Sequence, residues 1–516
     1  MDRRKFLQMT VAAGTGVFLS GSALSKTNDL VLQTLKSNPS KYPNIVIILA
    51  DDLGYGDLSC YDGIKLKTPN IDRMAEEGIK FTNGYAASAT CTPSRYSLLT
   101  GAYPWRKKDA AILPGDAPLL IDENEITLPS MLKKAGYKTA IVGKWHLGLG
   151  NGNVDWNKQI NPGPNERGFD YSFIMPATTD RVPTVYVENG LIQNLDPNDP
   201  LEVSYEKNFP GQPTGKDNPQ LLRLKASHGH DNTIINGVGR IGFAKGGKSA
   251  IWNDETMAET FLGKAVDFVS KNKGNPFFLY YALHEPHVPR LPGSQFLGKS
   301  GLGPRGDSIL EADWCVGQFL DFLKKENLEE NTLVIFSSDN GPVLDDGYQD
   351  EAVEKNDGHT PAGLLRGGKY SLYDGGTRVP FIVKWNGKIK PGTSNALVSQ
   401  VDFFASFAAM TNQKNNSVDS EDVLGAFLGK TNNGRNDIVL EGIKHNTVYR
   451  EGSWVLIPPY PGVAILPNVN IESGNSNVYQ LYDLNLDIGE QKNLAEKYPE
   501  KVKSMIKKLE GIKKMQ

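Results

Sequence analysis

The sequence is short of cysteine, of net charge and of long apolar segments. Its 516 residues include only three cysteines, Cys60, Cys91 and Cys315, and this odd, low number excludes a disulfide framework. The net charge of −3 lacks the basic excess of a nucleic-acid-binding protein, so no nucleic-acid partner is expected. Beyond the N-terminal region, no run of apolar residues reaches the length that a membrane-spanning helix requires. The remaining composition, with 39% hydrophobic and 22% charged residues, is that of a folded globular protein.

The first 25 residues have the pattern of an export signal. Arg3-Arg4-Lys5 precedes a stretch of apolar and small residues, and Ala23-Leu24-Ser25 offers small residues for cleavage. The arginine pair followed by Phe-Leu is typical of a twin-arginine signal. We therefore predict a signal peptide over residues 1–25, a periplasmic or secreted protein, and the export machinery as a partner. An uncleaved membrane anchor is the alternative.

Apolar segments alternate with amphipathic ones along most of the chain. We predict strands over residues 44–50, 79–86, 139–142, 276–283, 332–338 and 379–385, and helices over 68–78, 127–135, 255–271 and 308–326. This alternation predicts an α/β fold with a large, mostly parallel mixed sheet flanked by helices. Residues 150–250 are rich in Gly, Pro and Asn, and we expect long ordered loops there.

The end of the chain has a different pattern. Residues 447–456 and 478–484 are predicted to be antiparallel strands, and residues 500–514 a terminal helix rich in lysine. They indicate a smaller C-terminal α+β subdomain that contains an antiparallel sheet. The predicted organisation is therefore a signal peptide (1–25), a main domain (40–405) that carries the chemistry, and a C-terminal subdomain (406–516).

Three of the predicted strands end directly in polar residues. These are Asp51-Asp52, the stretch from Lys144 to His146, and Asp339-Asn340. In α/β folds ligands bind beyond the carboxyl ends of the strands, so the three clusters point to one site. The two oxygen-rich pairs suit calcium or magnesium rather than zinc. An Asp-Asp pair on its own is more often a solvated turn or a helix cap.

The most specific string in the sequence runs from Cys91 through Thr92, Pro93 and Ser94 to Arg95, followed by Leu-Thr-Gly at 99–101. It resembles the signature of the type I formylglycine-dependent sulfatases, the arylsulfatase family. The resemblance covers most of the main domain and implies the fold of the alkaline phosphatase superfamily. It also implies that a formylglycine-generating maturation enzyme oxidises Cys91 to formylglycine. A buried cysteine in a proline turn is the structural alternative.

In this family, formylglycine allows a sulfate monoester to be hydrolysed in two steps. One hydroxyl of the hydrated aldehyde attacks sulfur and expels the alcohol, and the second, once deprotonated, expels sulfate from the sulfo-enzyme intermediate. The resemblance implies a sulfuric ester hydrolase that binds one calcium ion, rather than magnesium, and the ion would lower the pKa of the nucleophile. The implied ligands are Asp51, Asp52, Asp339, Asn340 and the formylglycine derived from Cys91.

The resemblance assigns roles to five further residues. Lys144 should bind a sulfate oxygen, and His146 should hydrogen-bond formylglycine and act as the base for sulfate elimination. Arg95 should orient the nucleophile. His287 should donate a proton to the leaving alcohol, and Lys369 should contact the sulfate and the leaving-group oxygen. Taken alone, Arg95 and Lys144 would be read as ordinary surface charges.

The motifs leave open what carries the sulfate, so the choice of substrate must come from loops. The long polar loops favour a sulfated glycan, with a galactose-type unit as one option, and they leave exo and endo action open. The alternatives are a phosphonate or phosphate monoester hydrolase with the same nucleophile, a small-molecule arylsulfatase, and a non-catalytic protein that binds sulfated glycans. Candidate substrate-binding residues, each of which could equally be structural, are Asp180, Arg181, His228, His230 and His359.

Overall fold

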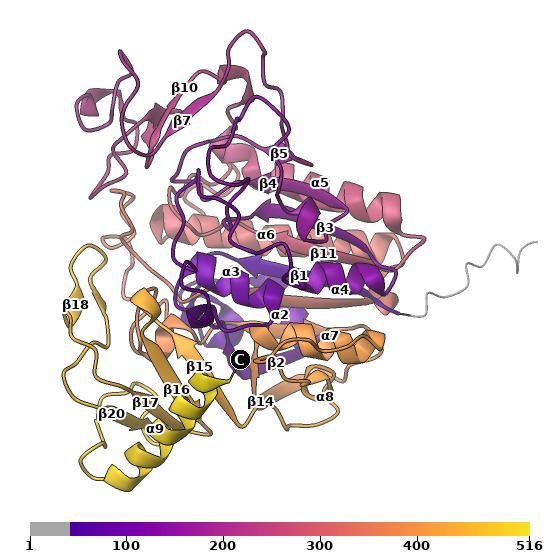
Figure 1. Cartoon of the computed structure of the whole chain (residues 1–516), viewed down its shortest axis with the longest axis vertical. Helices are drawn as coiled ribbons and strands as arrows, with labels where there is room; N and C mark the ends of the chain where they lie inside the picture. The colour runs from indigo at the N-terminus through magenta and orange to yellow at the C-terminus, as the bar shows by residue number, and fades with distance from the viewer. Residues whose placement is uncertain (1–41, 516) are drawn as a thin grey trace, which may run out of the picture. The chain divides into compact units, whose positions relative to one another are not determined.

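A ten-stranded sheet forms the centre of the structure (Figure 1). The computed structural model describes residues 42–515, so the signal peptide predicted over residues 1–25 lies outside the described part. The strands follow the order β14-β2-β13-β12-β1-β11-β3-β4-β5-β6 across the sheet. Their bounds are β1 (Asn44–Ala50), β2 (Ile79–Tyr85), β3 (Lys138–Lys144), β4 (Tyr171–Met175), β5 (Val187–Glu188), β6 (Leu191–Ile192), β11 (Phe277–Ala282), β12 (Thr332–Ser338), β13 (Phe381–Lys384) and β14 (Gly392–Ser399).

The middle of this sheet is parallel and its margins are mixed. Strands β12, β1, β11, β3 and β4 pair in parallel, each with its neighbour. Strand β13 lies antiparallel between β12 and β2, and β5 and β6 extend the other margin in antiparallel fashion. The predicted α/β class with a large, mostly parallel mixed sheet is therefore confirmed.

Helices cover both faces of the sheet, which explains why its central strands are continuous apolar runs. Alternate residues of β1 point to opposite faces, so that Ile47 packs into one core and Ile48 into the other. The first core includes residues of α3 (Cys91–Thr100), α4 (Leu128–Lys134) and α7 (Phe403–Thr411), and the second includes residues of α2 (Pro69–Glu76), α5 (Met257–Asn272) and α6 (Gly303–Lys325).

The largest boundary error among the predicted helices is at the start of α6. This helix begins at Gly303 rather than at residue 308. Pro304 stands in its first turn, where a backbone nitrogen needs no hydrogen-bond partner, and the sequence prediction missed this start signal.

A second, antiparallel sheet lies towards the C-terminal end, and α9 (Pro499–Lys514) contributes to the same hydrophobic core. One detail of the prediction for this region is wrong. Residues 447–456 do not form a single strand, because the chain turns at Gly452, with a φ of 57°, to form a hairpin. The strands of the sheet are β15 (Asp437–Glu441), β16 (Thr447–Glu451), β17 (Trp454–Ile457) and β20 (Gln480–Asp483).

The two sheets belong to one compact unit that begins at Tyr42. The predicted boundary between residues 405 and 406 falls inside α7, and it stays a prediction. Loops make up most of residues 150–250, as predicted. The remaining strands and the remaining α-helix are short: β7 (Glu202–Ser204), β8 (Ile234–Ile235), β9 (Val238–Gly239), β10 (Phe243–Lys245), α8 (Leu424–Phe427), β18 (Ile465–Leu466) and β19 (Ile471–Glu472).

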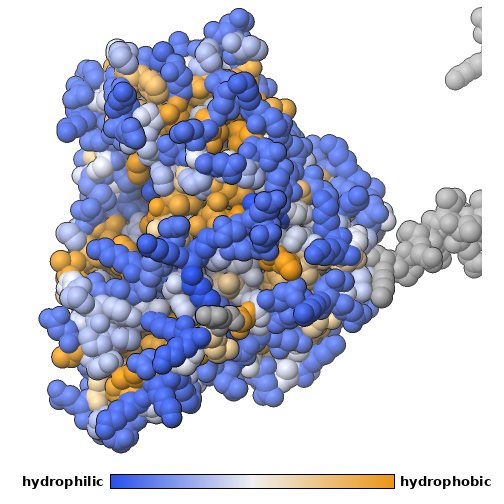
Figure 2. Space-filling model, in the orientation of Figure 1, coloured by the Kyte–Doolittle hydropathy of each residue, from blue (hydrophilic) through white to orange (hydrophobic). Residues whose placement is uncertain are grey.

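Hydrophilic residues cover most of the face drawn in Figure 2, with hydrophobic residues in patches between them. Within residues 42–515, no helix is long and apolar enough to cross a membrane.

Candidate active site

The polar residues at three strand ends meet at one edge of the large sheet. Asp51 follows β1, Lys144 is the last residue of β3, and Asp339 follows β12. Because β12, β1, β11 and β3 are successive parallel neighbours, their carboxyl ends lie side by side. Cys91, the first residue of α3, reaches the same place: its sulfur lies within 4.8 Å of ligand atoms of Asp51 and His287. The structure thus brings together residues that the sequence motifs had marked separately.

Three buried carboxylates form the centre of this cluster. Ligand atoms of Asp51, Asp52 and Asp339 lie within 4.8 Å of one another. Burial, together with the charges of the other two carboxylates, raises the pKa of Asp51 against the lowering effect of Lys144. Among the described residues, Asp51 Oδ1 and Asn340 Oδ1 have no hydrogen-bond partner, whereas the Asn340 amide donates to Asp52 Oδ1 at 2.7 Å. Carboxylates that repel one another and free buried oxygens fit a hard divalent cation.

Three buried cations surround the carboxylates, each facing a different one. Even with Asp346 counted as a fourth carboxylate, which also pairs with Lys369, a divalent cation would make the cluster positive and suited to an anion. The pairs are Lys144–Asp51 at 2.6 Å, Lys369–Asp52 at 2.8 Å and Arg95–Asp339 at 2.8 Å.

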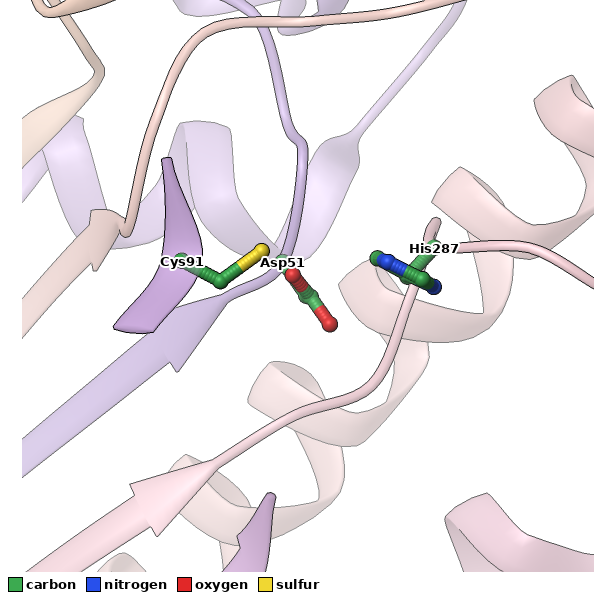
Figure 3. Close-up of side chains that lie close together, drawn as sticks. All are labelled: Asp51, Cys91 and His287. Carbon is green, nitrogen blue, oxygen red and sulfur yellow. The ribbon is translucent and has the colours of Figure 1, made fainter. Parts of the chain in front are cut away.

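Cys91 is buried within this cluster and is only 2% exposed. Burial raises the pKa of its thiol to about 12. The thiol therefore stays protonated at neutral pH, and a protonated thiol is a poor nucleophile. In Figure 3 the sulfur points towards Asp51, which lies between Cys91 and His287. The position suits a nucleophile, but the unmodified side chain does not.

Two buried histidines border the same cluster. His146 Nε2 is 3.0 Å from the carbonyl oxygen of Leu113, and its Nδ1 has no hydrogen-bond partner among the described residues. Because a carbonyl only accepts, we assign the proton to Nε2, which leaves the Nδ1 lone pair free. His287 Nδ1 is 2.7 Å from the carbonyl oxygen of Val288, and its Nε2 is 3.8 Å from Asp52 Oδ2. Burial lowers the pKa of both histidines, followed by the charges of Lys144 and Arg181 at His146 and of Lys369 and Lys144 at His287.

A second polar cluster, formed by Asp180, Arg181 and His230, comes from loops. Asp180 Oδ2 is 2.9 Å from His230 Nε2, and Arg181 donates to both Asp180 oxygens at 3.0 and 3.1 Å. His230 Nδ1 is 3.0 Å from the carbonyl oxygen of His228. Both ring nitrogens of His230 face acceptors, so both carry protons and the ring is cationic. Burial alone would lower the pKa of His230, but the hydrogen bond to Asp180 and its charge raise it.

This second cluster adjoins the pocket at the strand ends. Arg181 and the hydrogen bond with His230 lower the pKa of Asp180 most, and a charge on the nearby His287 would lower it further. Asp180 is the main group that raises the pKa of Arg181, and the side chain of Cys91 is near enough to contribute if it is ionised. We call the strand-end group of Asp51, Asp52, Cys91, Arg95, Lys144, His146, His287, Asp339, Asn340 and Lys369 the sulfate pocket, and the group of Asp180, Arg181 and His230 the loop cluster.

The other two predicted substrate-binding residues are placed differently. His228 contributes its backbone carbonyl to His230. His359 is buried, with Nε2 2.8 Å from Asp57 Oδ1, and Asp57 also pairs with Arg305. The contact of His359 with Asp57 indicates a structural role in the packing of the surrounding loops and gives no support to a contact with substrate.

Two residues of the site escaped the sequence prediction. Asp346 Oδ2 accepts from Lys369 at 2.7 Å, and Asp346 Oδ1 accepts from the Tyr370 hydroxyl at 3.2 Å. A carboxylate oxygen of Asp346 also lies within 4.8 Å of ligand atoms of Asp52 and His287. Tyr370 has a φ of 74°, which is uncommon for a bulky residue. In the sequence, the acidic pair at 345–346 was the only signal that could have pointed to Asp346, but such a pair also occurs in ordinary polar loops.

A family model described as Sulfatase matches residues 43–413. The chain belongs to the sulfatase family. This sulfatase is 50% identical over 499 residues to the N-acetylgalactosamine-6-O-sulfatase of Bacteroides thetaiotaomicron, which covers 96% of this chain and 98% of that protein. It is 34% identical over 403 residues to human arylsulfatase A, with 75% of this chain and 68% of that protein covered. Human N-acetylgalactosamine-6-sulfatase is 32% identical over 399 residues, with coverages of 75% and 66%.

Solved structures agree with this assignment. A sulfatase chain from work on the metabolism of multiple glycosaminoglycans by Bacteroides thetaiotaomicron has a TM-score of 0.91 and 51% identity, and it covers 92% of this chain and 100% of that one. A phosphonate monoester hydrolase of Agrobacterium radiobacter shares the fold, with a TM-score of 0.54, 17% identity and coverages of 92% and 95%. The predicted fold, family and enzyme class are confirmed. The family brings a formylglycine-type modification and a metal ion, and Cys91 and the carboxylates fit both.

Proposed function

We propose that this sulfatase removes a 6-O-sulfate group from an N-acetylgalactosamine unit of a sulfated glycan. The observation that carries the proposal is the 50% identity to the N-acetylgalactosamine-6-O-sulfatase of Bacteroides thetaiotaomicron, over 96% of this chain and 98% of that protein. An alignment that runs almost from end to end includes the loops as well as the core, and loops select the substrate on a common scaffold. Human arylsulfatase A, in comparison, aligns with 75% of this chain.

The metal that we propose is calcium, because the candidate ligands are all protein oxygens and the carboxylates can bind it without several waters, which magnesium would keep. When bound, the cation offsets the charge of the sulfate and favours deprotonation of the nucleophile. Hydrated formylglycine at position 91 supplies a hydroxyl nucleophile that the buried thiol of Cys91 cannot replace. The proposed ligands are Asp51, Asp52, Asp339, Asn340 and the side chain at position 91.

The chain's own residues then bind the sulfate and move protons. Lys144 and Lys369 direct their ammonium groups to sulfate oxygens, while Arg95 keeps its contact with Asp339. His146 takes a proton at its free Nδ1 from the side chain at position 91, which is base catalysis by a neutral imidazole. His287 donates a proton to the leaving alcohol from Nε2, and the negative charge of the bound sulfate ester favours its protonated form.

The loop cluster is the proposed place for the sugar that carries the sulfate. Asp180, Arg181 and His230 lie beside the sulfate pocket, and they present a carboxylate and two cations in fixed directions. Such directional groups can discriminate between the hydroxyl configurations of sugars, because a buried polar group that loses its partner is costly.

The remaining parts of the proposal concern maturation and location. We infer that a formylglycine-generating enzyme modifies Cys91 and that the export machinery then moves the protein to the periplasm or beyond. The mass of the peptide that contains residue 91, and the N-terminal sequence of protein recovered from each cell fraction, test these two steps separately.

The direct test is the release of inorganic sulfate from a panel of sugars. The protein is co-expressed with a formylglycine-generating enzyme, supplied with calcium, and compared with the Cys91→Ala variant. The panel contains N-acetylgalactosamine 6-sulfate and 4-sulfate, galactose 6-sulfate, N-acetylglucosamine 6-sulfate, an aryl sulfate and a phenyl phosphonate. We expect the 6-sulfate of N-acetylgalactosamine to have the highest kcat/KM.

A preference for any other compound in the panel would indicate a different function or substrate. A preference for the phosphonate would favour the phosphonate hydrolase alternative, and a preference for the aryl sulfate would favour a small-molecule arylsulfatase. A preference for another sugar sulfate would keep the enzyme class and overturn the proposed substrate.

A further inference from the structure

Residues 345–348, which we call the bridging segment, lie between the sulfate pocket and the loop cluster. We propose that this segment determines specificity by fixing the position of His230 relative to Lys369, and thereby the position of the sugar relative to the sulfate. The inference rests on the proposed function, in which the two clusters bind the two parts of one substrate. Its experiment uses whichever sugar sulfate the wild type hydrolyses best, so it can fail independently.

Asp346 connects the bridging segment to the sulfate pocket. Its Oδ2 accepts from Lys369 Nζ at 2.7 Å, and its Oδ1 accepts from the Tyr370 hydroxyl at 3.2 Å. Lys369 in turn donates to Asp52 at 2.8 Å. With Asp346 in place, the ammonium group of Lys369 is held between two carboxylates, so a shift of the segment would move Lys369.

Gly347, the next residue, connects the segment to the loop cluster. Its backbone runs so close to His230 that a Cβ atom at position 347 would lie 1.9 Å from Nδ1 and 2.1 Å from Cε1 of the ring. Its φ of 108° also disfavours any residue with a side chain. The ring of Tyr348 also packs against His230, with 4.9 Å between the two ring centroids. Because Gly347 has no side chain, the ring of His230 can occupy the position in which it meets Asp180.

Hydrogen bonds fix the bridging segment to the loop that carries His230. The amide of Ser227 donates to the Gly347 carbonyl at 3.0 Å, and its hydroxyl donates to Asp345 at 2.6 Å. The Tyr348 hydroxyl donates to the Gly239 carbonyl at 2.7 Å. The segment and the loop are therefore expected to move as one body.

The spacing between the two clusters therefore depends on two adjacent residues. Asp346 holds Lys369 in the sulfate pocket, and Gly347 leaves room for His230 in the loop cluster. Because hydrogen bonds hold the segment in place, we expect a side chain at position 347 to push the His230 ring away, which would break its 2.9 Å contact with Asp180 and leave the Lys369 contacts in place. The loop cluster should then lose its geometry, while the sulfate pocket keeps most of its own.

The test compares the two clusters in one variant, Gly347→Ala. The effect on the loop cluster is measured by kcat/KM for the preferred sugar sulfate, and the effect on the sulfate pocket by the inhibition constant of inorganic sulfate, the product. We expect kcat/KM to fall by about 100-fold, as for a small misplacement of a substrate-binding group, and the inhibition constant to change by less than about threefold. Gly136→Ala is the matched control, because Gly136 also has a positive φ, of 94°, but nothing lies within 4 Å of the added Cβ; its kinetics should equal those of the wild type.

A second variant separates the clash from a general loss of folding. In Gly347→Ala/His230→Ala the ring that blocks the new methyl group is gone. We expect the double variant to have kcat/KM close to that of His230→Ala, so the effects of the two changes are not additive. Melting temperatures of all variants are measured in parallel.

The inference is overturned if Gly347→Ala weakens inhibition by inorganic sulfate as much as it lowers kcat/KM. It is also overturned if the two substitutions have additive effects, or if Gly136→Ala gives the same loss. A wild type that prefers a different sugar sulfate would overturn the proposed substrate but not this inference, whereas a wild type without activity on any sugar sulfate would overturn both.

Discussion

The sulfate pocket and the loop cluster lie side by side, but they are built in different ways. The sulfate pocket takes its residues from the ends of β1, β3 and β12 and from the start of α3, and Asp51, Lys144 and Asp339 are fully buried there. The loop cluster takes Asp180 and His230 from loops that are held by hydrogen bonds to one another. The comparison shows how a common scaffold can fix the chemistry while loops set the substrate. Experiments that affect one part and spare the other are the way to test it.

The largest effect is expected at position 91. Replacing Cys91 by Ala or Ser removes the precursor of the proposed nucleophile, and kcat should fall by a factor on the order of 10⁴ or more. Sulfate release from the preferred sugar measures this, with mass spectrometry of the wild-type peptide to verify the modification. Residual activity within about tenfold of the wild type would show that formylglycine is not the nucleophile.

Removal of the metal should be the next largest effect and should be confined to the sulfate pocket. Treatment with a chelator should abolish sulfate release, because Asp51, Asp52 and Asp339 would repel one another and leave the nucleophile unassisted. It should also lower the melting temperature, since a ligand at 100 times its Kd stabilises a protein by about 2.7 kcal/mol. Calcium should restore both properties better than magnesium. Full activity in chelator would contradict the metal site.

A change in the loop cluster should give a smaller and more selective effect. Asp180→Asn removes the charge that holds both His230 and Arg181. We expect kcat/KM for the preferred sugar sulfate to fall by about 100-fold, while the inhibition constant of inorganic sulfate changes by less than about threefold. An equal change in both quantities would mean that the two clusters are not separate parts of the site.

The pair between His230 and Asp180 should also make stability depend on pH. The folded-state pKa of His230 is raised above its usual value, so its contribution is complete below the unfolded-state pKa of about 6.5 and is lost as the pH rises through the folded-state pKa. Relative to His230→Gln, the wild type should therefore be more stable by about 1.5–3 kcal/mol at pH 6, with the difference shrinking at alkaline pH. Urea unfolding of both proteins at several pH values measures this. A difference that grows with pH would contradict the cationic ring.

The smallest effect on catalysis is expected at His359. Its ring is buried against Asp57, so His359→Gln should lower the free energy of unfolding by about 1 kcal/mol and leave kcat/KM for every sugar of the panel unchanged. Thermal melts and the substrate panel test the two parts. A change in substrate preference would return His359 to the substrate-binding residues.

Much of the sulfate pocket could be predicted because its residues follow regular elements. Asp51 and Asp339 come directly after apolar strands, and Cys91 stands in a specific string. The fold class followed from the alternation of strands and helices in the same way. Asp346 could not be found, because it reaches Lys369 from a loop whose path no periodic pattern records.

The sequence by itself determined the family, six strands of the large sheet and the residues at the strand ends, because local patterns and strand direction bring these side chains to one edge of the sheet. Only the tertiary structure decided which loop residues belong to the site. It placed His230 against Asp180 and His359 against Asp57, although both histidines looked alike in the sequence. Contacts between distant loops depend on how the chain packs, and residues far apart in sequence carry no local signal of such a meeting.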